Sequence, residues 1–201
     1  MRLERLEATQ RPEKLKAVFD GEALTVSASL CVQFSLCAGM ELDEEAFSAL
    51  KAAVAKEAAR ERAVRILTAS AVSERELEKR LLQKGMLPSD AADAVAWLKE
   101  HRFLDDAATA AQLVDSAVRK GYGRARVKNI LYEKGIPKDL WEEALARIPA
   151  MDDAIDRFLA AKLRGRTADE KTIKKTIDAL LRRGFSYGEI RDALRRYEAD
   201  L

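Results

Sequence analysis

The sequence contains a single histidine, His101, and only four prolines among its 201 residues. A Ser-His-Asp triad, a Cys-His pair or a multi-histidine metal site would have to be built around that one imidazole. His101 follows Trp97 and Leu98 near the end of an expected helix, where capping or packing is the usual role of such a residue. The scarcity of histidine argues against most general acid-base chemistry.

Cysteine and long apolar runs are also scarce. Cys31 and Cys37 lie in an apolar stretch without zinc-like spacing, so we expect buried free thiols in a reducing cytoplasm. No apolar run approaches the roughly 20 residues of a membrane helix, and residues 1–14 lack the apolar region of a signal peptide. We therefore expect a soluble, cytoplasmic protein that does not contact membranes.

Charge is abundant but nearly balanced, with 36 basic and 34 acidic residues and a net charge of +2. The balance argues against binding of nucleic acid by bulk charge alone and against a disordered tail protein. Basic residues outnumber acidic ones only after residue 120, where the chain has 18 basic and 14 acidic residues. Positive charge therefore gathers toward the C-terminus.

Apolar residues recur three or four apart over most of the chain, which predicts a mainly helical protein. The exception is two short alternating runs around Asp20 and Gly21, a dipeptide that suits a tight β-hairpin. After the hairpin, we expect an apolar helix over residues 28–38 that Gly39 ends in the left-handed conformation. A long helix should begin near Asp43.

Helix boundaries are marked by recurring signals. Ser/Thr-x-x-Glu capping boxes predict three helix starts: Ser73 with Glu76, Thr167 with Glu170, and Ser186 with Glu189. Each expected C-cap glycine follows a basic residue and precedes an apolar one: Gly85, Gly135 and Gly184. These glycines lie about 50 residues apart, a spacing typical of a repeat protein.

Alignment on the three glycines shows that the period is real. An apolar stripe keeps the same register relative to the glycine in every copy. Four residues before the glycine stand Leu81, Leu131 and Leu180, and six residues after it stand Ala91, Trp141 and Ile190. Ten residues after it stand Val95, Leu145 and Leu194, and thirteen residues after it stand Leu98, Ile148 and Tyr197. Alanines 94, 144 and 193 lie beside this stripe. In the third copy, the middle helix places Ile173, Ile177 and Leu180 on a face that is rotated by about one residue from the face of Leu77 and Leu81 or of Val127 and Leu131.

In each copy, a further apolar helix is expected before the helix that the glycine ends, at about residues 57–69, 105–120 and 151–163. The fold class is therefore mainly α: an elongated tandem array of three three-helix repeats behind a small N-terminal β-hairpin and helix element. The predicted segments are the N-terminal element at 1–56 and repeats at 57–102, 103–149 and 150–201.

Other candidate sites have structural explanations. The acid pairs Asp105-Asp106 and Asp152-Asp153 open expected helices, where carboxylates cap backbone amides. The stretch GYGRARVKN lacks the third glycine and the preceding strand of a dinucleotide-binding loop, although a phosphate at Arg124 and Arg126 stays open. We expect no enzyme, no catalytic residue, no cofactor and no metal.

Basic side chains on the expected middle and last helices are the candidate partner-binding residues. For any single one, a solvated helix face is the simpler interpretation, but in a repeat array they would form a discontinuous stripe that suits a polyanionic or acidic partner. The residues are Arg75, Lys79, Arg124, Arg126, Lys128, Lys171, Lys174, Lys175, Arg182, Arg191 and Arg195.

A DNA-reading helix-turn-helix is disfavoured for the first repeat. Its last helix, SDAADAVAWLKE, carries more acids than bases, whereas a recognition helix brings arginine, asparagine or glutamine to base edges. Sequence-specific DNA binding is therefore not expected.

The runs SERELEKRLLQKGM and HRFLDDAATAAQLVDSAVRKGYGRARVKNILYEKGIPKDLWEEAL resemble the RecX regulatory proteins. The likeness is strong over residues 60–148, whereas residues 150–201 match as a weaker third repeat. The residues that match the family pattern are Ser73, Glu76, Leu77, Leu81, Lys84, Gly85, Phe103, Leu104, Asp105, Asp106, Gly123, Arg124, Leu131, Lys134, Gly135 and Ile136. Most are helix caps and core positions, so they identify the fold rather than the contact surface.

The resemblance implies tandem three-helix repeats and a protein that binds the RecA recombinase filament on single-stranded DNA. We expect this protein to be a monomer without enzymatic activity. Such a protein inhibits filament extension, ATP hydrolysis and strand exchange. Non-specific binding to free single- or double-stranded DNA stays open. Two alternatives also stay open: a nucleic-acid-binding helical repeat that is independent of RecA, and a protein-interaction scaffold.

Overall fold

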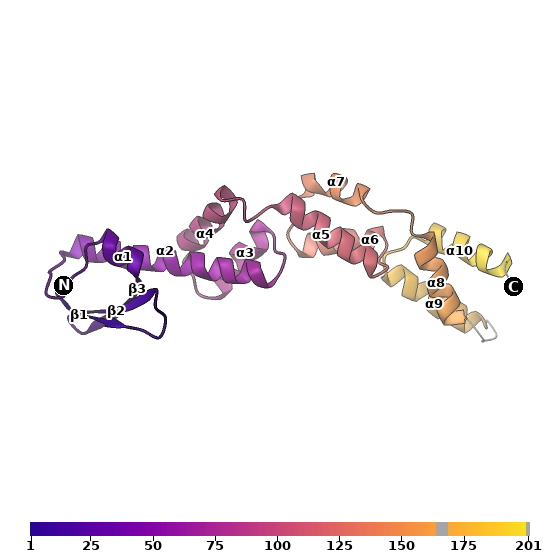
Figure 1. Ribbon diagram of the computed structural model, residues 1–201. Helices are drawn as coiled ribbons and strands as arrows, with labels where there is room; N and C mark the ends of the chain where they lie inside the picture. The colour runs from indigo at the N-terminus through magenta and orange to yellow at the C-terminus, as the bar shows by residue number, and fades with distance from the viewer. Residues whose placement is uncertain (164–168, 200–201) are drawn as a thin grey trace. The chain divides into compact units, whose positions relative to one another are not determined.

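The computed structural model describes residues 1–163 and 169–199 as a small sheet followed by helices (Figure 1). The chain divides into two compact units. The first unit comprises Met1–Ile66 with Glu78–His101, and the second comprises Leu67–Leu77 with Arg102–Leu201. Within the described residues, no helix has the length and hydrophobicity needed to span a membrane.

The N-terminal sheet has three antiparallel strands in the order β1-β2-β3. They are β1 (Leu3–Ala8), β2 (Lys14–Phe19) and β3 (Glu22–Ser27). The predicted hairpin is confirmed, because Asp20 and Gly21 join β2 to β3 with φ angles of 41° and 84°. Sequence reasoning missed β1, whose two leucines lie three residues apart and do not alternate as a strand does.

Helix α1 (Ala28–Gln33) is shorter than the predicted helix over 28–38. Its C-terminus closes early because Ser35 adopts a φ of 48° and the Leu36 amide donates to the Cys31 carbonyl at 2.8 Å. Gly39 is left-handed as predicted, with a φ of 88°, but it lies in the loop beyond the helix. The expectation of buried thiols is wrong for Cys37, which is exposed, while Cys31 is half-buried.

Helix α2 (Glu44–Ala69) begins where predicted, with the Asp43 carboxylate accepting from the Ala46 amide at 2.7 Å. Its first half packs Phe47 and Leu50 into the core beneath the sheet, where the Phe47 and Phe19 rings meet edge to face at 5.0 Å. No separate helix begins at residue 57, because α2 continues unbroken through that position. The helix expected over 57–69 is therefore its second half.

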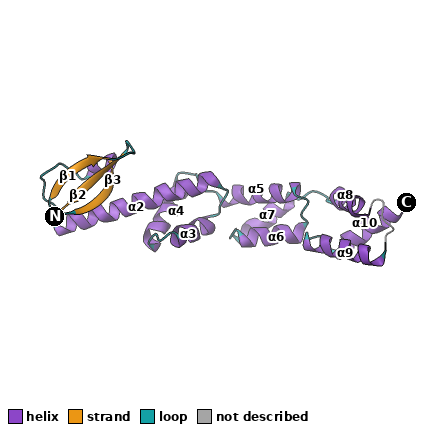
Figure 2. Ribbon diagram, turned by 90° about the horizontal axis from the view of Figure 1, so that it is seen from below, coloured by secondary structure: helices purple, strands orange, loops and turns teal. Residues whose placement is uncertain are grey.

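Eight further helices follow α2 within the described residues (Figure 2). The middle helices of the three repeats are α3, α6 and α9. Their bounds are α3 (Glu74–Gln83), α4 (Pro88–Glu100), α5 (Asp106–Arg119), α6 (Arg124–Glu133), α7 (Trp141–Ala146), α8 (Asp152–Leu163), α9 (Glu170–Arg182) and α10 (Tyr187–Ala199), with a short 3-10 helix at Lys138–Leu140.

The repeat period is visible in the burial of the stripe. Leu81, Leu131 and Leu180, one on each middle helix, are fully buried. Alanines 94, 144 and 193 are buried in all three copies as well. The second and third repeats each enclose an apolar cluster, centred on α5 to α7 and on α8 to α10.

The three predicted C-cap glycines are confirmed. Gly85, Gly135 and Gly184 have φ angles of 80°, 69° and 89°. In each copy the glycine amide donates to the carbonyl three residues back, and the next amide donates to the carbonyl of the buried leucine. This pattern of two backbone hydrogen bonds is the Schellman motif. All three middle helices therefore end with the same geometry.

The capping boxes are confirmed to different extents. Ser186 and Glu189 form the full reciprocal pair, with each side chain bonded to the other residue's amide. The Ser73 hydroxyl accepts from the Glu76 amide at 3.1 Å. Thr167 lies outside the described residues, and the N-cap of α9 is Asp169, whose carboxylate accepts from the Thr172 amide.

Two joints connect the repeats within the second unit. At the first joint, the Ser73 hydroxyl donates to the Lys134 carbonyl at 2.5 Å, and the Glu74 amide donates to the Asp106 carboxylate at 2.9 Å. At the second joint, the amides of Gly123 and Ala125 donate to the carbonyls of Arg183 and Gly184. Both joints place the N-terminus of one middle helix against the C-cap turn of the next.

Candidate partner-binding surface

The middle helices α3 and α6 each expose a pair of basic side chains. Arg75 and Lys79 on α3, and Arg124 and Lys128 on α6, are all exposed. Residues four apart lie on the same side of a helix. Each pair therefore forms a short basic face, as the sequence predicted.

Helix α9 carries the largest group, with Lys171, Lys174, Lys175 and Arg182 all exposed. Lys171 and Lys175 are one turn apart, and Lys174 adjoins both. At the start of this helix, hydrogen bonds from Thr172 hold the pKa of the Asp169 carboxyl below its usual value, with a smaller contribution from the charge of Lys175.

The last helix, α10, exposes Arg191 and Arg195 one turn apart. Arg191 lies 3.5 Å from the neighbouring Asp192 carboxylate, a contact that surface exposure makes weak. The adjacent Arg196 is different, because it pairs with Asp152 and Asp156 of α8 at 3.0 Å. Arg196 attaches α10 to α8 and is not part of the candidate surface.

Two of the predicted residues have roles inside the chain. The Arg124 guanidinium donates to the Leu145 carbonyl at 3.1 Å and so caps the end of α7. Arg126 is half-buried, pairs with Glu133 at 3.1 Å, and packs its backbone against Gly184 at the second joint. Their positive charge is partly committed to the fold.

Eight of the predicted residues form neither an ion pair nor a side-chain hydrogen bond within residues 1–163 and 169–199. Each is an exposed side chain on α3, α6, α9 or α10. They are Arg75, Lys79, Lys128, Lys171, Lys174, Lys175, Arg182 and Arg195. These side chains form the free basic set of the surface.

Sequence reasoning missed Arg183, which is central to the second joint. Its guanidinium donates to the Lys120 carbonyl at 3.2 Å and lies 4.8 Å from the Phe158 ring. A planar cation that both stacks and donates is typical of arginine. The sequence signal was the Arg-Gly pair at the C-cap, which indicated only a helix end.

The residues excluded from catalysis have local roles. A ring nitrogen of His101 lies 2.8 Å from the Trp97 carbonyl oxygen, and the centroids of the His101 and Trp97 rings are 4.7 Å apart with their planes tilted by 39°. The Asp105 carboxylate caps α5 by accepting from the amides of Ala107 and Ala108. The Asp106 carboxylate accepts from the Glu74 amide at the first joint. No cluster of three metal-ligating side chains occurs in the part of the chain that the structure describes.

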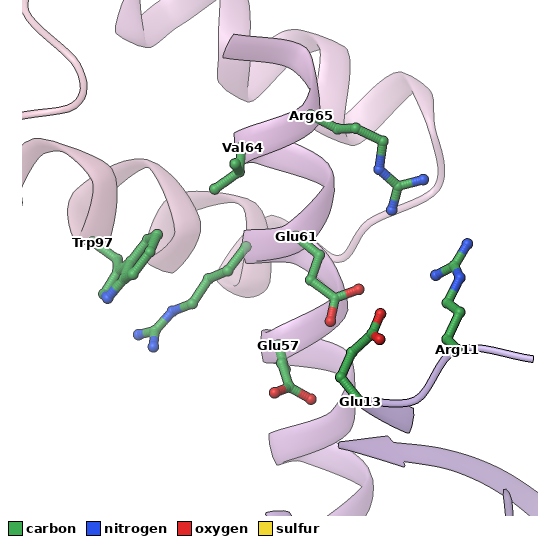
Figure 3. A pocket seen from close by; sticks show the side chains of 8 residues that line it. Arg11, Glu13, Glu57, Glu61, Val64, Arg65 and Trp97 are labelled. Atoms are coloured by element: carbon green, nitrogen blue, oxygen red, sulfur yellow. The ribbon is translucent and has the colours of Figure 1, made fainter. Parts of the chain in front are cut away.

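One pocket of about 670 Å³ lies in the first unit, between the β1–β2 loop, α2 and α4. Figure 3 shows Glu13, Glu57 and Glu61 grouped near Arg11 and Arg65, with Trp97 on the far side of α2. Because Glu57 and Glu61 both pair with the buried Lys14, these acids attach the sheet to α2. The mixture of signs favours no ligand class.

The comparisons with known proteins match this arrangement repeat by repeat. The family model described as "RecX, first three-helix domain" matches residues 59–98. The second three-helix domain matches residues 105–145, and the third matches residues 152–194. Each match contains one of the three C-cap glycines.

Relatives named "Regulatory protein RecX" occur in Escherichia coli O1:K1 and in Escherichia coli O157:H7 (strain EC4115). Each is 33% identical over 151 residues, which cover 68% of this chain and 90% of the relative.

Solved structures show the same fold. A crystal structure of regulatory protein RecX has a TM-score of 0.71 at 22% identity and covers 95% of this chain and 98% of its own. A crystal structure of RecX from Lactobacillus salivarius has a TM-score of 0.60 at 19% identity, over 73% of this chain and 99% of its own. Three domain matches in order and a relative aligned over nine-tenths of its length show that this chain belongs to the RecX family of regulatory proteins.

Proposed function

We propose that the protein binds the RecA recombinase filament on single-stranded DNA and inhibits filament extension, ATP hydrolysis and strand exchange. Membership of the RecX family supports a regulatory role. The observation that carries the proposal is the free basic set, which places exposed cations on the middle helix of every repeat. A ligand that itself repeats is the natural partner of such an arrangement.

The contact residues of this proposal are the eleven basic side chains predicted from the sequence, with the free basic set as its core. Their charges would meet the acidic groups of the filament, either its phosphates or its carboxylates. The chain would bridge successive protomers and hinder their addition. The repeat boundaries at 57, 103 and 150 belong to the same proposal, although α2 runs through the first of them.

The proposed mode of action is binding without catalysis. The His101 ring is committed to Trp97, and the acid pairs serve helix starts and joints. Sequence reading of duplex DNA is not part of the proposal, because α4 carries Asp90 and Asp93 in its N-terminal half.

A titration into RecA-catalysed ATP hydrolysis on single-stranded DNA tests the proposal. We expect inhibition to approach completion near stoichiometric amounts of the protein. Unchanged hydrolysis at that ratio would contradict the function. Binding to single-stranded DNA without RecA is measured in parallel, since binding there of equal affinity would favour the RecA-independent nucleic-acid-binding protein instead.

A further inference from the structure

The three middle helices share an exposed apolar residue that neither the fold nor the basic surface explains. Three residues before each C-cap glycine stand Leu82, Tyr132 and Leu181, with exposed fractions of 41%, 71% and 42%. We call this the pre-cap position. Single exposed apolar residues are ordinary on protein surfaces, but recurrence at one position of every repeat is not.

Helix capping does not require an apolar side chain at the pre-cap position. These residues contribute only their carbonyls, each of which accepts the amide of the C-cap glycine at 2.9 or 3.0 Å. The apolar contact of a Schellman motif joins the buried leucine one residue earlier to the residue after the glycine. The side chains at the pre-cap position therefore face solvent while their backbone is held in place.

A lysine of the free basic set lies on the same side of each middle helix. Lys79 precedes Leu82 by three residues, Lys128 precedes Tyr132 by four, and Lys174 precedes Leu181 by seven. All three ammonium groups are exposed, and none is ion-paired within the described residues. Each repeat thus presents one apolar side chain together with at least one unpaired cation.

The side chains at this position favour a protein over nucleic acid as the partner. Contacts to single-stranded bases use aromatic rings for stacking. Only Tyr132 offers a ring, whereas leucine stands in the first and third repeats. The property that all three share is apolarity, which gains free energy in a protein pocket.

We infer that the pre-cap position and its neighbouring lysine form a repeated docking site for an acidic protein surface with an apolar pocket, one site per repeat. The inference rests on the proposed function, in which that surface belongs to the protein subunits of the RecA filament. It assigns the contacts of these helix faces to protein and not to DNA. The partner would offer one pocket and one carboxylate group to each repeat.

The test replaces the three side chains by glutamine, as Leu82→Gln, Tyr132→Gln and Leu181→Gln, which favours helix formation. Affinity is measured for RecA filaments on single-stranded DNA and for the same DNA alone. We expect filament affinity to fall by at least about tenfold, because three apolar side chains lose their burial in the partner's pockets, while affinity for DNA alone stays unchanged.

A matched control replaces three other exposed apolar residues, as Val32→Gln, Leu87→Gln and Phe103→Gln. The control should bind filaments like the parent chain. Equal loss in the control, equal loss toward bare DNA, or no loss in the test variant would overturn the inference. If the triple variant loses helicity, Tyr132→Gln alone replaces it and should weaken filament binding several-fold.

The outcome separates this inference from the proposed function. A parent chain that does not bind RecA filaments contradicts both. A parent chain that binds, together with a pre-cap variant that binds equally well, contradicts the docking site alone.

Discussion

The two units of the molecule attach their parts in different ways. In the first unit, ion pairs connect separate elements: Lys14 joins the sheet to Glu57 of α2, and Asp93 of α4 pairs with Lys56 and Arg60 of α2 at 2.5 and 2.8 Å. In the second unit, Arg196 also ion-pairs α10 to α8, but the joints between repeats are hydrogen bonds made by backbone groups, the buried Ser73 hydroxyl and the Asp106 carboxylate. The contrast predicts that acid and salt weaken the ion-paired attachments of the sheet and α4 in the first unit more than the joints of the second unit.

This difference determines how precisely each unit fixes the positions of its helices. Ion pairs tolerate small shifts of their long side chains, whereas backbone hydrogen bonds at close approach fix position and angle. In the second unit, the joints set how successive middle helices follow one another. The proposed binding surface depends on that spacing.

The largest expected effect comes from Gly184→Ala. Gly184 has a φ of 89°, and an added Cβ would overlap the backbone nitrogen of Arg126 at the second joint. Left-handed strain and overpacking together should destabilise the second unit by about 3 kcal/mol. Hydrogen exchange of the α6 and α9 amides measures the loss.

Gly188→Ala is the matched control for that substitution. Its nearest atom, the Ser186 hydroxyl oxygen, is 3.9 Å from an added Cβ, and no positive φ is involved. Stability should stay constant or rise slightly, because alanine favours helix formation. A destabilisation as large as that of Gly184→Ala would mean that the second joint is not the cause.

Ser73→Ala tests the first joint. The Ser73 hydroxyl is fully buried, accepts from Glu76 and donates to Lys134, so its loss removes a cap and leaves a carbonyl unsatisfied. We expect a cost of about 2 kcal/mol by thermal unfolding. Ser186→Ala removes an exposed cap alone and should cost about 1 kcal/mol; equal costs would show that the joint contributes nothing.

Arg183→Lys sharpens the second joint further. Lysine keeps the charge but loses the planar group that lies over Phe158 and donates to the Lys120 carbonyl. The expected cost is about 1 kcal/mol, measured by denaturant unfolding. Arg182→Lys, at an exposed neighbouring position, should leave the midpoint unchanged.

The smallest effect is the acid response of the first unit. Desolvation raises the pKa of the Asp93 carboxyl, but hydrogen bonds from Lys56 and Arg60 outweigh it and hold the pKa below its usual value. The ion pairs therefore add stability above the unfolded pKa of about 4 and lose it as pH falls through the lower folded value.

Hydrogen exchange of α4 between about pH 5 and pH 3 should reveal a loss of less than about 1 kcal/mol, since the pair is partly solvated. In the Asp93→Asn variant, the stability of α4 should already be lower at pH 5 and should lose this part of its pH dependence. A parent and variant with the same pH profile would show that Asp93 does not hold α4.

Local patterns predicted much of the fold. The glycine spacing located three helix ends with their correct conformation, and Asp20-Gly21 located the hairpin turn. Sequence reasoning missed what depends on distant partners. β1 is a strand only because β2 pairs with it, and no local pattern shows that Gly123 and Gly184 must be small because two backbones meet.

The basic residues were located by their spacing, but their roles were not. Lys128 and Arg124 look equivalent in the sequence, yet Arg124 caps α7 through the Leu145 carbonyl, 21 residues away. The pre-cap position could have been found by alignment on the glycines. Burial separates Leu81 from Leu82, and a run of two apolar residues does not show which one faces solvent.

The affinity of a charge-deleted variant for RecA filaments on single-stranded DNA tests the account most directly. The variant carries Lys171→Ala, Lys174→Ala, Lys175→Ala and Arg182→Ala, and its control carries Arg5→Ala, Lys16→Ala, Lys51→Ala and Lys138→Ala, with the same loss of charge. We expect the α9 variant to bind roughly tenfold more weakly, as four rim charges worth a few tenths of a kcal/mol each would give, and the control to bind like the parent chain. An α9 variant that keeps its helicity and binds as tightly as the parent chain would contradict the account.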